Sequence, residues 1–154
     1  MPAVRDGRGS VLLLFPVGVL AVLVLAAVAV DSSIAFLGER ELAGAVAAAA
    51  NDAATEAISD QAFYARGTVE LDDAAVARVA EERVRTSLDA SRYQGLQVQA
   101  TVLRPSGGGC AWALEVSASA TVHYVFAGVV PGTPRVATVD STARSRPVQE
   151  DTRC

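Results

Sequence analysis

The sequence contains no lysine: its positive charge is carried by 13 arginines that are scattered along the chain, and its formal net charge is −4. Proteins that bind nucleic acid gather basic side chains on one surface, where they neutralise phosphates. No such cluster exists between Arg5 and Arg153. The sequence therefore predicts no nucleic-acid partner.

Histidine is almost absent. The only one, His123, lies in a segment of alternating residues. On a strand, the hydroxyl of Ser119 would be about 13 Å away, which is too far for a nucleophile–base pair. We therefore expect an ordinary exposed histidine and no catalytic residues.

Signatures of metal and cofactor sites are missing as well. The acidic pairs Asp72-Asp73 and Glu81-Glu82 are more simply a helix cap and a solvated helix face, because no further ligand follows at a suitable spacing. Gly107-Gly108-Gly109 lacks the lysine and the following hydroxyl of a phosphate-binding loop and indicates a turn. We expect no metal site, no cofactor and no enzymatic activity.

A long apolar run is what the sequence does contain. Val11 to Val30 has no charged or hydrogen-bonding side chain. As a helix, these residues would span roughly 30 Å, the thickness of the hydrocarbon layer of a membrane. Pro16 and Gly18 interrupt the run early, where a membrane helix tolerates a kink. The run predicts one transmembrane helix in contact with membrane lipid.

The charges that flank this run predict its orientation. Arg5 and Arg8 precede it, whereas Asp31, Glu39 and Glu41 follow it. Because the positive side of a membrane helix stays in the cytoplasm, we expect a single-pass protein of the cell membrane with a cytoplasmic N-terminus.

These features divide the chain into four segments. Residues 1–10 are expected in the cytoplasm, 11–30 in the membrane, 31–59 in an exported continuation of the helix, and 60–154 in a small extracytoplasmic α+β domain. About 120 residues follow the apolar run, enough for one compact domain.

A cleavable signal peptide is the alternative to an anchor. Ala27-Val28-Ala29 has the small-x-small pattern of a cleavage site. The apolar run is longer than the core of a signal peptide, and helical sequence continues through the candidate cut. We favour the uncleaved anchor and keep cleavage after Ala29 as the alternative.

Beyond the membrane segment, nothing interrupts a helix as far as Ser59, since proline is absent and alanine, the best helix former, is abundant. We expect one continuous helix from about Val11 to Ser59, roughly 70 Å long. One narrow apolar stripe should lie against the C-terminal domain or against neighbouring copies. The stripe consists of Ile34, Leu37, Leu42, Ala45, Val46, Ala49, Ala53, Ala57 and Ile58.

The remaining sequence predicts a connector, a second helix and a sheet. Asp60 to Leu71 reads as the connector, and Asp72 or Asp73 caps a helix that runs to about Ala90. Three segments then alternate between apolar and polar residues, as strands do: Leu96–Val102, Trp112–Phe126 and Arg135–Ala143. The fold class is therefore α+β, with a long N-terminal transmembrane helix, a second helix and a three-stranded antiparallel sheet that the helices cover.

Cys110 and Cys154 are the only cysteines. In an exported, oxidising setting, pairing is the default expectation. A turn between Phe126 and Arg135 would bring together residues whose numbers add to about 261–264, and those of the two cysteines add to 264. We predict a disulfide between them, with one residue of the register absorbed by a bulge or by the tail. A free thiol at Cys154 and an intermolecular bridge are the alternatives.

Several short elements stand in order along the first 55 residues: Arg8-Gly9-Ser10-Val11, the apolar run, Val30-Asp31, then Leu37, Arg40 and Leu42, and the alanine block from Ala45 to Ala54. They resemble the TadE/TadG-like proteins of tight-adherence (Tad, or Flp) pilus assembly. That family has a basic-Gly-Ser/Gln start, an apolar span ending in Val-Asp, an Arg-x-Leu element and an alanine-rich helix. The resemblance implies a pilin-like plan.

Leu14 decides which kind of family member the resemblance implies. Processed pseudopilins of this family carry glutamate at the fifth position after their cleavage site, and after a cut between Gly9 and Ser10 that position is Leu14. The resemblance therefore implies an uncleaved accessory protein of pilus assembly or secretion. Its partners would be other pilin-like or pilus-assembly membrane proteins, or further copies of itself. Arginine without lysine and abundant alanine indicate a GC-rich, bacterial coding sequence.

Two other functions stay open at this point. One is an anchored extracytoplasmic domain, unrelated to pili, whose sheet binds a ligand or a component of the cell envelope. The other is a secreted domain released by cleavage after Ala29.

Overall fold

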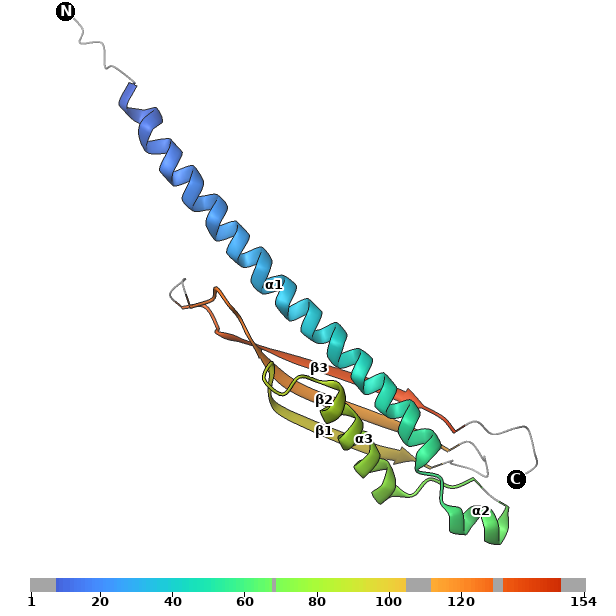
Figure 1. Cartoon of the computed structure of the whole chain (residues 1–154). Helices are drawn as coiled ribbons and strands as arrows, with labels where there is room; N and C mark the ends of the chain where they lie inside the picture. The colour runs from blue at the N-terminus through green and yellow to red at the C-terminus, as the bar shows by residue number, and fades with distance from the viewer. Residues whose placement is uncertain (1–7, 68, 105–111, 129–131, 148–154) are drawn as a thin grey trace, which may run out of the picture.

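The computed structural model describes residues 8–67, 69–104, 112–128 and 132–147. The chain begins with one long helix, α1, which runs over Arg8–Glu56 and contains 49 residues (Figure 1). At 1.5 Å per residue, α1 is roughly 70 Å long. The prediction of a single continuous helix is confirmed, although α1 ends three residues before Ser59.

The connector that the sequence predicts after this helix contains a short helix of its own, α2, over Asp60–Arg66. The side chain of Ser59 accepts a hydrogen bond from the N–H of Ala62, and Gly67 ends the helix in the left-handed conformation, with φ 66°. The prediction of two helices was therefore wrong by one. A serine cap and a glycine stop define even this seven-residue helix, as they do longer ones.

Helix α3 spans Asp73–Ser87. The predicted cap is confirmed, because the carboxylate of Asp72 accepts hydrogen bonds from the N–H groups of Ala74 at 2.8 Å and Ala75 at 2.9 Å. The outward-facing pair of Glu81 and Arg85 forms as expected. The helix ends earlier than the predicted Ala90, since Leu88 is already extended.

The three predicted strands form one antiparallel sheet in the order β1-β2-β3. They span Tyr93–Leu103, Ala113–His123 and Val136–Ser145. Side chains alternate along β2, so that Leu114 and Val116 are fully buried and Glu115 is only half-buried. The expected meander and the expected inward face are both confirmed.

The register between β2 and β3 differs from the predicted one. His123 pairs with Val136, and the numbers of all paired residues add to 259 rather than to 261–264. The strand ends early because the N–H groups of Val125 and Phe126 bond to another element instead of to β3. The geometric support for a Cys110–Cys154 disulfide is therefore lost. Both cysteines lie outside the described residues.

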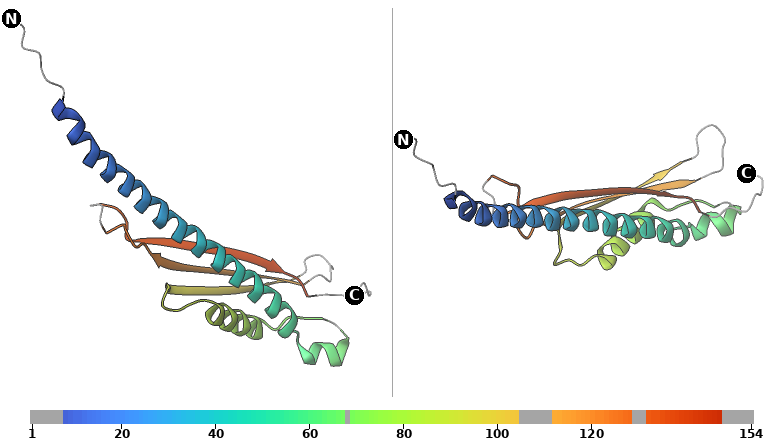
Figure 2. Two further views of the ribbon diagram at one scale, coloured as in Figure 1. Left: turned by 45° about the horizontal axis from the view of Figure 1, so that its top comes forward. Right: turned by 90° about the horizontal axis from the view of Figure 1, so that it is seen from above.

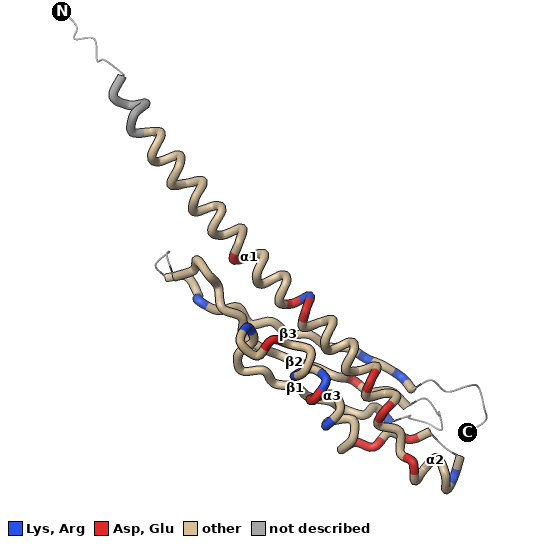
Figure 3. Tube along the Cα trace, in the orientation of Figure 1, with Lys and Arg blue, Asp and Glu red and all other residues tan. Residues whose placement is uncertain are grey.

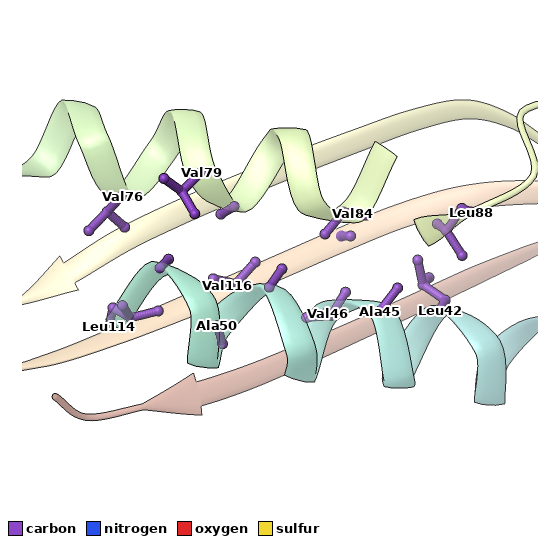
Figure 4. Close-up of a cluster of buried hydrophobic side chains, with 14 of the residues drawn as sticks. Leu42, Ala45, Val46, Ala50, Val76, Val79, Val84, Leu88, Leu114 and Val116 are labelled. Atoms are coloured by element: carbon purple, nitrogen blue, oxygen red, sulfur yellow. The ribbon is translucent and has the colours of Figure 1, made fainter. Parts of the chain in front are cut away.

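Two layers make up the domain. The distal half of α1 and the whole of α3 cover one face of the sheet, with α1 over β2 and β3 and α3 beside β1 (Figure 2). Between the layers lies a core of small and branched apolar side chains, several of which Figure 4 shows facing one another across the helices. Leu42, Val46, Val76, Val84, Leu114, Val116, Val122 and Val139 are its largest fully buried members.

The buried stripe of α1 is wider than the predicted one, because Ala50 and Ala54 are buried as well, and one predicted member lies outside it. Leu37 is 51% exposed, although the alanines of the stripe from Ala45 onward are buried. Gly38 and Leu42 take the inward positions of these turns, and a helix turns the side chain at 37 away from a face that includes 38 and 42. The residue at 37 is thus left on the outer face.

Candidate functional site

Asp31 is the only buried acidic or basic residue in the described part of the chain, with an exposed fraction of 9%. Its Oδ1 accepts hydrogen bonds from the backbone N–H of Val125 at 2.9 Å and of Phe126 at 3.0 Å. Its Oδ2 accepts a longer bond, of 3.2 Å, from the Phe126 N–H. The carboxylate thus holds the segment after β2 against α1.

This junction lies where the apolar part of α1 ends. Val30 and all the residues before it as far as Val11 are uncharged, and Asp31 is the first charged residue after them. Hydrogen bonds to a charged acceptor contribute about 1.5–3 kcal/mol each. The connection therefore fixes the end of the β2–β3 hairpin to one level of the long helix.

The hairpin reaches past Asp31 toward the N-terminal part of α1. A cavity of about 210 Å³ separates the two elements and is lined by Ala27 and Asp31 on the helix and by Tyr124 and Pro134 on the hairpin. A second, apolar hollow is formed by Phe126 with helix residues from Leu20 to Val30. The side chain of Phe126 therefore lies beside apolar residues that precede Asp31.

A second connection ties α1 to the sheet two turns further along. The hydroxyl of Tyr93 lies 2.8 Å from Oε2 of Glu41 and 3.2 Å from the carbonyl oxygen of Gly38, and it can donate its proton to either. Arg92 forms an ion pair with the same Glu41 carboxylate. Burial, with the nearby Glu41 carboxylate as the next cause, raises the pKa of Tyr93 to about 12.

Gly38 allows α1 to approach the sheet closely at this second connection. A Cβ atom built on Gly38 would lie 3.2 Å from Cγ2 of Val122, tighter than ordinary van der Waals contact, whereas one on Gly44 would meet nothing within 4 Å. The backbone of α1 thus packs directly on β2 at residue 38.

The apolar part of α1 has no cover. From Leu14 to Val30 the large side chains are exposed, and none of these residues is charged (Figure 3). By length and composition, this is the one described helix that could cross a membrane. Beyond it, Phe36 and Leu37 are 62% and 51% exposed on the outer side of α1.

The residues that the sequence analysis weighed for chemistry do not come together. His123 is exposed at the end of β2, and no group of three or more histidine, cysteine, aspartate or glutamate side chains is placed to hold a metal ion within the described ranges. Asp72 acts as the cap of α3. Gly107, Gly108 and Gly109 lie outside the described residues.

Comparisons with protein-family models, with curated proteins and with solved structures find no match to this chain. The TadE/TadG-like resemblance stays a prediction that depends on the residues quoted above.

Sequence reasoning missed the role of Asp31. It accounted for this carboxylate as the charged end of the apolar run, which gives no reason for the side chain to be buried. The partners of Asp31 are the backbone N–H groups of residues 94 and 95 positions further along the chain. Every residue except proline has such a group, so the side chains at those positions do not reveal the contact. A usable signal was the alternation of Tyr124 and Phe126 continuing beyond the end of β2, toward a turn without charges.

Proposed function

We propose that this chain is a membrane-anchored, pilin-like accessory protein of a Tad/Flp-type pilus assembly or secretion system. It has no catalytic role and acts by helix–helix association in and just above the membrane. The N-terminal part of α1 spans the membrane once, the N-terminus is cytoplasmic, and the sheet domain lies outside.

The proposal depends on the difference between the two sides of α1 beyond the apolar run: one side is buried and the other is exposed. The alanine stripe from Ala45 to Ala57 is buried inside the chain's own domain, so it is not available to neighbours. The opposite side of the same helix is uncovered, apolar at Phe36 and Leu37, and built of small residues at Ala43 and Ala47. Small side chains let a second helix approach closely.

Beyond the membrane segment, the outer side is thus a mixed surface, since the exposed Arg40 lies between the apolar residues and the small ones. A neighbouring helix that packs on α1 within the bilayer can follow it for several turns beyond Asp31 without meeting the sheet, which lies on the other side. Two parallel helices in contact over such a length are how a pilin-like protein associates with its partners.

The alternative function, an anchored or secreted binding domain unrelated to pili, would use another surface. The uncovered face of the sheet is polar, with Gln99 and Thr138 exposed on it. A ligand or an envelope component would bind there, and the outer side of α1 would be dispensable.

A pair of substitutions separates the two functions. In a strain lacking the gene, we expect the wild-type gene to restore surface pili counted by electron microscopy. Ala47→Arg should fail to restore them, because the long side chain holds a second helix away. Gln99→Arg, the matched control on the sheet, should restore them. The opposite pattern, or normal piliation without the gene, contradicts the pilus function.

A further inference from the structure

We propose that the segment directly after β2 enters the outer boundary of the membrane beside α1, so that Val125 and Phe126 contact lipid. The sheet domain then lies partly in the lipid surface instead of standing above it. This inference rests on the proposed membrane-spanning role of α1 and assigns a lipid-binding surface to a second, separate element.

Depth along α1 is the first reason. Phe126 shares an apolar hollow with Leu20, Leu23 and Val30. If residues 11–30 fill the hydrocarbon layer, the turn that ends at Val30 lies at its outer edge, and Leu23 lies roughly 10 Å further in. A side chain held beside these residues reaches the level of the lipid.

The chemistry of the hairpin fits that level. Val125 is 65% exposed and Phe126 is 39% exposed, so neither has a full partner in the chain. The sequence from Val125 to Pro134 contains no charged residue. Arg135 follows directly and is exposed. A long basic side chain at this place can keep its charge among the head groups while its stem lies along apolar surface.

The backbone N–H groups at the start of the hairpin are also hydrogen-bonded within the protein, as a lipid environment requires. Irregular backbone is costly in lipid because unpaired N–H and C=O groups lose their hydrogen bonds to water. Here the N–H groups of Val125 and Phe126 both donate to Asp31, and the Tyr124 N–H donates to the Arg135 carbonyl. Asp31 thus pairs two N–H groups that would otherwise favour contact of this segment with water.

Lipid is favoured over a second copy of the chain as the occupant of this surface. The hollow around Phe126 is continuous with the exposed residues of α1 that the bilayer itself must cover. The hairpin also stands on the side of α1 that carries the sheet, away from the outer surface at Phe36 and Ala47.

The test is quenching of tryptophan fluorescence by lipids brominated on their acyl chains. The native Trp112 is replaced by phenylalanine, and one tryptophan is introduced into the full chain at a time, as Leu20→Trp, Phe126→Trp, Val125→Trp or Tyr64→Trp. Each variant is reconstituted in phosphatidylcholine vesicles with and without brominated chains. Tyr64 is 84% exposed on α2, far along the domain, and serves as the unquenched control.

We expect Leu20→Trp and Phe126→Trp to lose a comparable part of their fluorescence in brominated vesicles, and Tyr64→Trp to lose none. Val125→Trp should lose about as much fluorescence as Phe126→Trp. It provides the same test if Phe126→Trp does not fold. Quenching at position 20 without quenching at 125 or 126 overturns the hairpin proposal and leaves the membrane helix standing. Quenching at neither overturns both.

A protein-to-lipid titration separates lipid from a second copy. Contact with lipid predicts the same quenching of Phe126→Trp at every ratio. Quenching that appears only as the protein is diluted means that another copy covers the hairpin at higher density, and this result overturns the assignment to lipid.

Discussion

Asp31 has two structural roles. A carboxylate directly after an apolar run sets the end of that run, and the same carboxylate binds two backbone N–H groups of a hairpin that lies 94 and 95 residues away. A charge that loses contact with water needs such compensation, because an unpaired buried charge is strongly destabilising. This side chain therefore helps to fix the position of the domain along α1, together with the contacts of Tyr93.

We predict that Asp31→Ala destabilises the protein in detergent by about 3–6 kcal/mol, since two N–H groups lose their charged acceptor. The amides of Val125 and Phe126 should then exchange their hydrogens faster. Glu39→Ala removes the same charge from an exposed position of α1 and should change neither quantity. Equal effects of the two substitutions would show that the Asp31 bonds contribute nothing.

Tyr93 makes a second prediction at this scale, on pH. Its pKa is raised to about 12 by burial and by Glu41, whereas tyrosine in an unfolded chain has a pKa of about 10. Below pH 10 both states keep the proton and the contribution to stability is complete. Between about pH 10 and 12 the unfolded state loses the proton first, so the free energy of unfolding falls as the pH rises.

The wild-type protein should therefore lose more stability over this range than Tyr93→Phe, by at most about 2–3 kcal/mol. Unfolding by denaturant at a series of pH values measures it. Tyr64→Phe removes an exposed hydroxyl and should follow the wild type. Identical curves for Tyr93→Phe and the wild type would contradict the raised pKa.

At the scale of the element, α1 shows which features of a helix its hydrophobic period predicts and which it does not. Its length, its alanine-rich inner face and the three strands could be predicted, because hydrophobic period and helix propensity are local properties of the sequence. Leu37 was placed wrongly on the inner face. The inward residue is Gly38, whose close approach to Val122 is a tertiary contact that a hydrophobic pattern does not reveal. The end of β2 could not be placed either, because the N–H groups of Val125 and Phe126 bond to Asp31, which lies outside both strands.

Two neighbouring alanines on α1 test this division into faces. Ala49 is fully buried, whereas Ala48 is exposed. Ala49→Leu should overpack the core and lower the free energy of unfolding by roughly 1–3 kcal/mol, while Ala48→Leu should leave it nearly unchanged. Chemical unfolding of the purified variants measures both. Equal stabilities would mean that α1 does not pack on the sheet as described.

At the scale of the whole molecule, the long helix and the sheet domain are arranged side by side rather than end to end. The end of the sheet at His123 and Val136 points toward the apolar part of α1, and the other end points toward α2 (Figure 1). Leu14 to Val30 carry no charge, and charged residues follow from Asp31 onward along α1 and through the domain (Figure 3). A molecule built this way has one apolar end and one charged end. If α1 spans a bilayer, as we propose, only two orientations are available to it.

The flanking charges choose between these two orientations, and they give the last prediction. Arg5 and Arg8 stand before the apolar run, and basic residues stay on the cytoplasmic side. A reporter enzyme that is active only outside the cytoplasm, fused after Arg153, should be active in the native host. The same reporter fused before Met1 should be inactive. A reporter that works only in the cytoplasm should give the reverse pattern. Cytoplasmic activity after Arg153 would place the sheet domain inside the cell, where neither an exported pilus component nor an oxidised cysteine pair is expected.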